Sequence, residues 1–66
     1  MYISNVSLLE VRKKPKDPSK IIIKRGTAIK IVGPPITCNH EVWIHIQTIE
    51  NPIIDGYVLK KYIIKI

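Results

Sequence analysis

Apolar and polar residues alternate with a period of two in several short stretches of the chain, whereas no window keeps a helical period over three turns. Leu9 and Val11 fall on one face of such a stretch, and Glu10 and Arg12 fall on the other. A longer alternation runs from 41 to 49. Its two faces are Val42, Ile44 and Ile46 on one side, and Trp43, His45 and Gln47 on the other. This pattern predicts half-buried strands, each with one face on a core.

Prolines and glycines divide these stretches from one another. Residues 14–19 contain two prolines, which cannot join a strand ladder, and Gly26 suits a turn with positive φ. Loops are also expected at 33–40 and at Glu50-Asn51-Pro52, and Asp55-Gly56 is either another turn or a bulge at the start of a strand. The expected strands lie near 7–12, 20–25, 27–33, 41–49, 54–59 and 62–66. We therefore predict one all-β domain over 1–66, a small barrel of five to six short antiparallel strands.

Three consecutive isoleucines, Ile21, Ile22 and Ile23, break the alternation. One interpretation is a strand buried on both faces where a barrel closes. The other is an exposed apolar patch that receives a partner or a second copy of the chain.

Composition limits how the fold is stabilised and what it attracts. The chain has 66 residues and one cysteine, Cys38, so no intramolecular disulfide can form and the core must carry the fold. Its formal charge of +6 suits phosphates, anionic wall polymers or acidic proteins. The same lysines are also what an isoleucine-rich protein needs for solubility.

No targeting segment and no membrane-spanning stretch are evident from the sequence. The first residues lack a basic stretch followed by an apolar run, and no segment approaches the roughly 20 apolar residues that cross a bilayer. Membrane insertion is therefore not expected. A complete chain would be cytoplasmic, and a fragment of a larger protein could be extracytoplasmic or attached to a cell wall.

Five short motifs follow one another along residues 9–63. They are L-E-V-R-K-K-P at 9–15, S-K-I-I at 19–22, K-R-G-T at 24–27 with Ile29 and Ile31 after it, W-I-H-I at 43–46, and G-Y-V at 56–58 with Tyr62 and Ile63 after it. Together they resemble the bacterial SH3-like domain family, in which the corresponding patterns include L-x-V-R-x-x-P, K-x-G-T, W-x-K-V and G-W-V followed by Y-L.

The resemblance implies a small barrel that binds a ligand and catalyses no reaction. Many members of that family sit beside cell-wall hydrolases and bind peptidoglycan peptides, and others bind proteins. The chain departs from the family at Tyr57, where tryptophan is usual, and at His45, where lysine is common. Its 33–40 loop and the hairpin around Pro52 are longer, and the segment between Ser19 and Gly26 is shorter. The expected partner is a peptide, peptidoglycan or a protein.

Aromatic residues provide the first candidate site. SH3-like barrels commonly bind extended peptides in aromatic grooves, because flat rings contact an extended peptide at low entropic cost. The predicted groove comprises Trp43, His45, Tyr57 and Tyr62. In the alternative interpretation, Trp43 packs beneath the 34–40 loop as a small satellite core.

Basic residues provide the second candidate site. Small barrels also bind nucleic acid through a positive surface with an aromatic platform, a role in which Trp43 would stack on a base. A third interpretation is a structural role, in which free strand edges join two copies of the chain. The predicted basic patch comprises Arg12, Lys13, Lys14, Lys16, Lys20, Lys60 and Lys61.

Signals for catalysis are weak, so we expect no enzyme, no cofactor and no metal. The five carboxylates are scattered, and no nucleophile elbow, phosphate loop or dinucleotide fingerprint occurs. Cys38 and His40 share one loop, and His45 follows on the next strand. A structural zinc site needs four ligands, and this set lacks the second pair.

Overall fold

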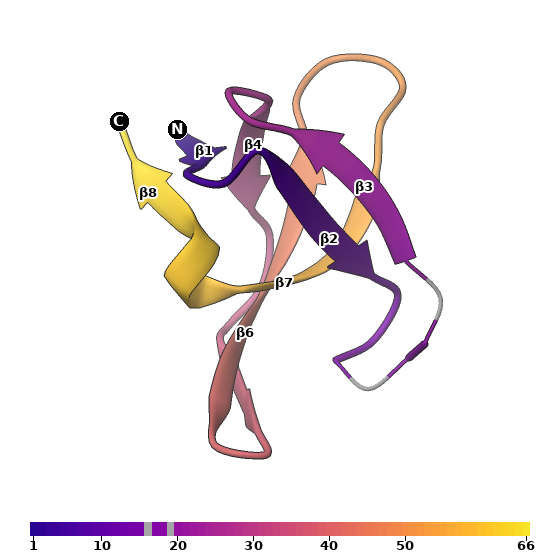
Figure 1. Cartoon of the computed structure of the whole chain (residues 1–66), viewed down its shortest axis with the longest axis vertical. Helices are drawn as coiled ribbons and strands as arrows, with labels where there is room; N and C mark the ends of the chain where they lie inside the picture. The colour runs from indigo at the N-terminus through magenta and orange to yellow at the C-terminus, as the bar shows by residue number, and fades with distance from the viewer. Residues whose placement is uncertain (16, 19) are drawn as a thin grey trace.

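The computed structural model describes residues 1–15, 17–18 and 20–66 and shows an all-β chain (Figure 1). Two residues named in the predictions, Lys16 and Ser19, lie outside the described residues. The elements are β1 (Tyr2–Ser4), β2 (Leu8–Arg12), β3 (Lys20–Lys24), β4 (Ala28–Ile31), β5 (Ile36–Cys38), β6 (Glu41–Thr48), β7 (Asp55–Leu59), the 3₁₀ turn η1 (Lys60–Tyr62) and β8 (Ile63–Lys65).

Among the described residues, all strand pairs are antiparallel and belong to one eight-stranded sheet. Seven strands follow the order β3-β2-β7-β6-β4-β1-β8, and β5 is added on β6. The path is open, because β3 and β8 stand at its two ends. The sheet bends so that β2 and β3 pass in front of β6 and β7 in the view of Figure 1.

One buried cluster fills the inside of this bend. β-Branched and leucine side chains dominate it, as expected for residues that pack tightly on a pleated surface. Its members come from β2, β3, β4, β6 and β7, and alternate with outward-facing residues along each strand. They are Leu9, Val11, Ile23, Ile29, Ile44, Ile46 and Val58.

Two short strands were not predicted, so the sheet has eight strands instead of five to six. β1 and β5 contain three residues each, too few to show a period of two. β5 lies inside the predicted 33–40 loop, where Pro34 and Pro35 directly precede it. Residues 39–40 form its actual turn, and Asn39 and His40 both have positive φ. A two-residue turn of this kind matches the twist of a β-hairpin.

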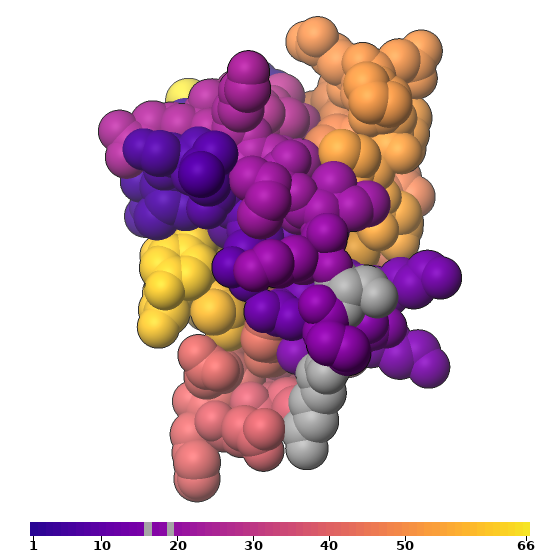
Figure 2. Space-filling view, turned by 45° about the vertical axis from the view of Figure 1, so that its right-hand side comes forward, coloured from indigo at the N-terminus to yellow at the C-terminus, as the bar shows by residue number. Residues whose placement is uncertain are grey.

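The hairpin of β5 and β6 extends beyond the core, at the bottom of Figures 1 and 2. Val42 therefore stays exposed although it was predicted to share the core face with Ile44 and Ile46. Its partner across the hairpin is Thr37, also exposed. The alternation is correct in this strand, but the core does not reach that far.

The isoleucine triplet is not buried on both faces. Ile23 is 5% exposed and belongs to the core, whereas Ile21 and Ile22 are 52% and 44% exposed. β3 ends the strand path, with β2 as its one partner in the described sheet, so nothing covers its outer face there. The interpretation of a strand enclosed from both sides is therefore wrong.

Glycines hold two positions that other residues would strain. Gly26 has φ 87° in the turn between β3 and β4, as predicted. Gly56 is the second residue of β7, inside the strand and not in a turn. Its backbone approaches β2 too closely for a side chain to fit between them. Within the described part of the chain, no helix is long and apolar enough to cross a membrane.

Candidate binding groove

The outward face of the β6–β7 hairpin carries most of the predicted groove. Side chains directly opposite each other on an antiparallel pair share one face and touch. Three successive pairs occupy this face. They are Trp43 with Leu59, His45 with Tyr57, and Gln47 with Asp55. Tyr57 is also paired with Arg12 of β2, so this face continues onto a third strand.

A hollow of about 660 Å³ opens at the Trp43 end of this face. We call it the first hollow. It lies between the outer face of β2, the β5–β6 hairpin and η1, and Pro15, which follows β2 in the chain, also lines it. Its walls are formed by Val6, Leu8, Glu10, Arg12, Pro15, Asn39, Glu41, Trp43, Leu59 and Tyr62.

Trp43 is among the residues that line the first hollow. It is 7% exposed, yet it lies outside the main core cluster, because it faces away from Ile44 and Ile46. Ile36 of β5 is its partner on the other side. The residue therefore lies on the predicted strand face, but that face is not open to water at this point. The sequence offered two alternatives for Trp43, packing in a small satellite core or lining a groove. In the structure its side chain is buried and also lines the first hollow.

The structure brings Trp43 and Tyr62 together in one hollow, and it pairs His45 with Tyr57 beside them. The His45 and Tyr57 rings stack with centroids 4.8 Å apart and planes 17° apart. Neither of these two residues lines the first hollow. Three of the four predicted groove residues thus share the outward face of the β6–β7 hairpin, whereas Tyr62 lies on η1 and packs against the core.

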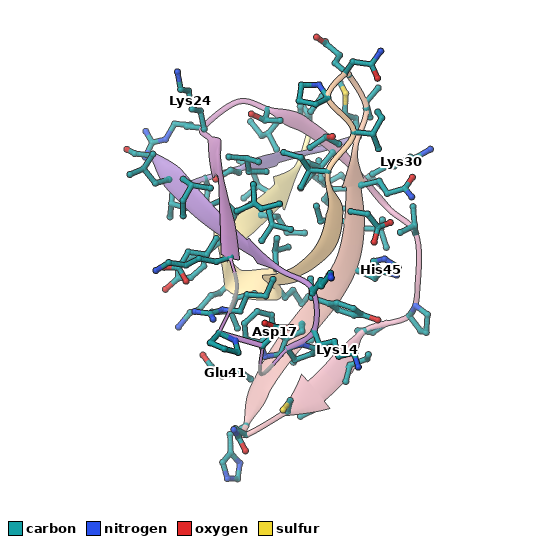
Figure 3. The ribbon with its side chains drawn as sticks, turned by 90° about the vertical axis from the view of Figure 1, so that its right-hand side faces the viewer. Lys14, Asp17, Lys24, Lys30, Glu41 and His45 are labelled. Carbon is teal, nitrogen blue, oxygen red and sulfur yellow. The ribbon has the colours of Figure 1, made fainter. Side chains whose placement is uncertain are left out.

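His45 is held from several sides. Its Nε2 lies 2.8 Å from Oδ1 of Asp55, and Gln47 Nε2 donates to Oδ2 of the same carboxylate at 2.8 Å. Figure 3 shows His45 between β6 and the 32–35 connection, where Gly33 leaves room for the imidazole. The hydrogen bond to His45, followed by that from Gln47, lowers the pKa of Asp55. The hydrogen bond to Asp55 holds the imidazole ring of His45 in its stacked position against Tyr57.

Arg12 and Glu10 form a charged wall of the first hollow. Arg12 Nη2 lies 2.8 Å from Glu10 Oε1, and Nη1 donates to the carbonyl oxygen of Asp17 at 2.7 Å. Lys20 approaches the same carboxylate at 3.3 Å. The hydrogen bond and charge of Lys20, together with Arg12, lower the pKa of Glu10. Two members of the predicted basic patch are therefore already paired with an acid.

The other predicted basic residues that the structure describes lie on two different elements. Lys13 and Lys14 are exposed in the loop after β2, and Lys60 and Lys61 are exposed on η1. Lys61 lies 4.0 Å from Glu41 and 5.1 Å from the centre of the Tyr62 ring. Other lysines lie elsewhere, and Figure 3 shows Lys24 and Lys30 at the end of the molecule opposite Lys14. Positive charge is thus spread over the surface.

A second hollow, of about 430 Å³, lies on the other side of Leu59 and Glu41, which line both hollows. It runs along η1 and the start of β8, and its walls are more apolar. They are formed by Asn5, His40, Glu41, Val42, Leu59, Lys60, Lys61, Ile63 and Ile64. We use "the groove" for the two hollows together.

Among the described residues, no group of three or more His, Cys, Asp or Glu side chains could hold a metal ion. Cys38 is half-buried near the end of β5, and His40 is exposed at the tip of the hairpin. His45 faces Asp55 and Tyr57 instead of these two residues.

Comparison with known proteins gives no relative: no family model, no curated protein and no solved structure matches the chain significantly.

Sequence reasoning missed most of the apolar lining. Leu59 lies between the two hollows, and it shares the alternation of its strand with Tyr57, so this signal was present. Val6, Pro15 and Asn39 reach the first hollow from connections, whose course no periodicity predicts.

Proposed function

We propose that this chain is a non-catalytic module that binds an extended segment of a partner peptide or protein in the groove. We further propose that its bent sheet is a small barrel of the SH3-like kind, an interpretation supported by the ordered motifs over 9–63. The observation that carries the functional proposal is the first hollow, where Trp43, Leu59 and Tyr62 converge from three elements.

The size and chemistry of the first hollow suit a peptide. Ligand sites commonly have volumes of roughly 300–1,000 Å³ and combine apolar walls with a few polar groups. Here Leu8 and Leu59 offer apolar contact, while Asn39, Arg12 and Glu10 bring hydrogen-bonding groups to the walls. Such a mixture favours a ligand that inserts one apolar side chain and presents its main chain to the polar walls.

Nucleic acid fits this site less well. Two carboxylates, Glu10 and Glu41, line the first hollow against one guanidinium, Arg12, so the net charge of its lining disfavours phosphate groups. Trp43 is too deeply buried to stack on a base, and the exposed lysines are spread over several faces.

The resemblance to the SH3-like family adds peptidoglycan peptides as a specific ligand class for the same groove.

The test is selection of binders from a random peptide library, with retention on bacterial wall sacculi at high salt measured in parallel. The single tryptophan of the chain reports on occupancy, because a ligand in the first hollow changes the surroundings of Trp43 and hence its fluorescence. Peptides that bind and shift this fluorescence support the proposal. Retention on sacculi, competed by those peptides, would identify wall peptide as the ligand.

The variant Leu8→Glu examines the groove without disturbing the core, because Leu8 lines the first hollow and is 65% exposed. We expect it to weaken peptide binding at least about tenfold, since it places a charge in an apolar contact. Ile53→Glu is the matched control: Ile53 is 52% exposed and lines neither hollow. Failure to select any peptide, or equal loss of binding in both variants, would reject the groove. Oligonucleotide binding that falls steeply with salt would favour the nucleic-acid alternative.

A further inference from the structure

The second hollow combines apolar walls with a positive rim. Val42, Ile63 and Ile64 provide the apolar surface, and Lys60 and Lys61 bring two ammonium groups to it. Its single lining carboxylate belongs to Glu41, which lies 4.0 Å from Lys61.

Lys60 is one of the two lysines that line the second hollow. It is exposed and forms no ion pair with the residues that the structure describes. Lys61 is also available in part, because its side chain is 62% exposed and its distance to Glu41 is at the limit for an ion pair. Exposed ammonium groups of this kind attract a carboxylate at modest gain and lose that attraction in salt.

The two hollows adjoin each other, since Leu59 and Glu41 line both. Lys60 follows Leu59 directly in the chain, so the lysines begin where the apolar contact of the first hollow ends. An extended peptide advances about 3.3 Å per residue. A segment anchored beside Trp43 and continuing past Leu59 would therefore bring its next few residues to the two lysines.

Resting on the proposed function, we propose that the partner segment is acidic on one side of its apolar anchor, with Asp or Glu side chains that meet Lys60 and Lys61 in the second hollow. The ligand class is thus an extended apolar–acidic peptide segment within a protein chain. The charges lining the two hollows set its direction: the first hollow is lined by two carboxylates and one guanidinium, and the second by one carboxylate and two ammonium groups.

The experiment compares peptide selections by three forms of the protein: wild type, the double variant Lys60→Glu/Lys61→Glu, and the double variant Lys24→Glu/Lys30→Glu. The random stretch is internal to the displayed chain, so no free terminal carboxylate contributes. Lys24 and Lys30 are exposed and line neither hollow, and both double variants have the same net charge. Any preference due to overall charge alone must change equally in both.

We expect the wild type to enrich Asp and Glu on one side of an apolar residue. The Lys24→Glu/Lys30→Glu variant should keep that pattern, and the Lys60→Glu/Lys61→Glu variant should lose it or select Lys and Arg there. For one selected peptide, replacing its acidic residues with their amides should weaken binding to wild type about three- to tenfold at low salt, and less at high salt.

Two results would overturn the inference while leaving the peptide groove intact. One is a selected set with no acidic preference, and the other is an equal change in both double variants. Absence of any selected peptide would instead reject the proposed function from which the inference starts.

Discussion

A β-carbon on Gly56 would lie 2.6 Å from the carbonyl oxygen of Arg12, closer than such atoms approach in folded proteins. The same carbon would lie 2.6 Å from Cγ1 of Val11. β7 therefore lies directly against β2 at this point, which no other residue type permits. The contact places Tyr57, the next residue, opposite Arg12. Gly56 thus joins the β6–β7 hairpin to the strand that supplies the charged wall of the groove.

We expect Gly56→Ala to destabilise the protein by about 3 kcal/mol or more, above the usual overpacking cost, because the backbone oxygen of Arg12 cannot rotate away. That is a large part of the roughly 3–10 kcal/mol available to a domain of this size. The midpoint of urea unfolding measures the change. Gly26→Ala is the control, since its β-carbon would meet nothing within 4 Å and only the positive φ would cost roughly 1 kcal/mol. Similar losses in both variants would contradict the close approach.

Thr48 holds the 49–54 connection through its buried hydroxyl. Its Oγ1 accepts a hydrogen bond from the amide of Ile54 at 2.7 Å and donates to the carbonyl oxygen of Pro52 at 3.1 Å. Thr48→Val keeps the shape of the side chain but leaves both groups without this partner, so we expect a loss of about 1–3 kcal/mol. Thr37→Val, on the exposed face of β5, should change stability by less than about 0.5 kcal/mol. Equal unfolding midpoints for the two variants would show that the hydroxyl does not anchor the connection.

Asp55 should make stability depend on pH through its bonds to His45 and Gln47. Its pKa is lowered in the folded state from an ordinary value of 3.8. The contribution of Asp55 to the free energy of unfolding is therefore complete above its pKa in the unfolded chain. It is lost as the pH falls through the lower pKa of the folded state. Because about half of the side chain is exposed, the gain should stay below about 1 kcal/mol.

Asp55→Asn provides the measurement. It should lower the free energy of unfolding at pH 6, and the difference from wild type should shrink as the pH falls below 3.8. Glu50→Gln is the control, because Glu50 is exposed and forms no ion pair with the described residues. A difference for Asp55→Asn that persists unchanged at acidic pH would assign its effect to packing.

Strands such as β2 and β6 could be predicted because their core residues recur at every second position. β6 is the best case: Ile44 and Ile46 are buried as the pattern requires. Three-residue strands carry no such signal, so β5 was mistaken for a loop. The alternation along a strand also does not show where the hydrophobic core ends. Val42 lies on the same strand face as Ile44 and Ile46, yet it is exposed.

The candidate site was predictable only in part for a related reason. Trp43 and His45 share a strand face because they are two residues apart in β6. Their partners on β7 lie opposite them because the two strands form an antiparallel hairpin. The first hollow depends instead on tertiary placement: Pro15 and Val6 reach it from connections, and Leu59 separates it from the second hollow. The pairing of Arg12 with Glu10 was likewise hidden, because charge counts do not show which cations are already neutralised.

The neighbours Ile22 and Ile23 offer a final test, because they have the same side chain in the same strand but opposite environments. Ile23 is 5% exposed in the core, and Ile22 is 44% exposed on the outer face of β3. Changing each to valine removes one methylene and keeps β-branching, so strand propensity is nearly constant. We expect Ile23→Val to cost about 0.5–1.5 kcal/mol and Ile22→Val less than about 0.5 kcal/mol. Equal costs, measured by urea unfolding at low protein concentration, would mean that Ile22 is also covered. A cost for Ile22→Val that grows with protein concentration would place that cover in a second copy of the chain, since association stabilises by mass action.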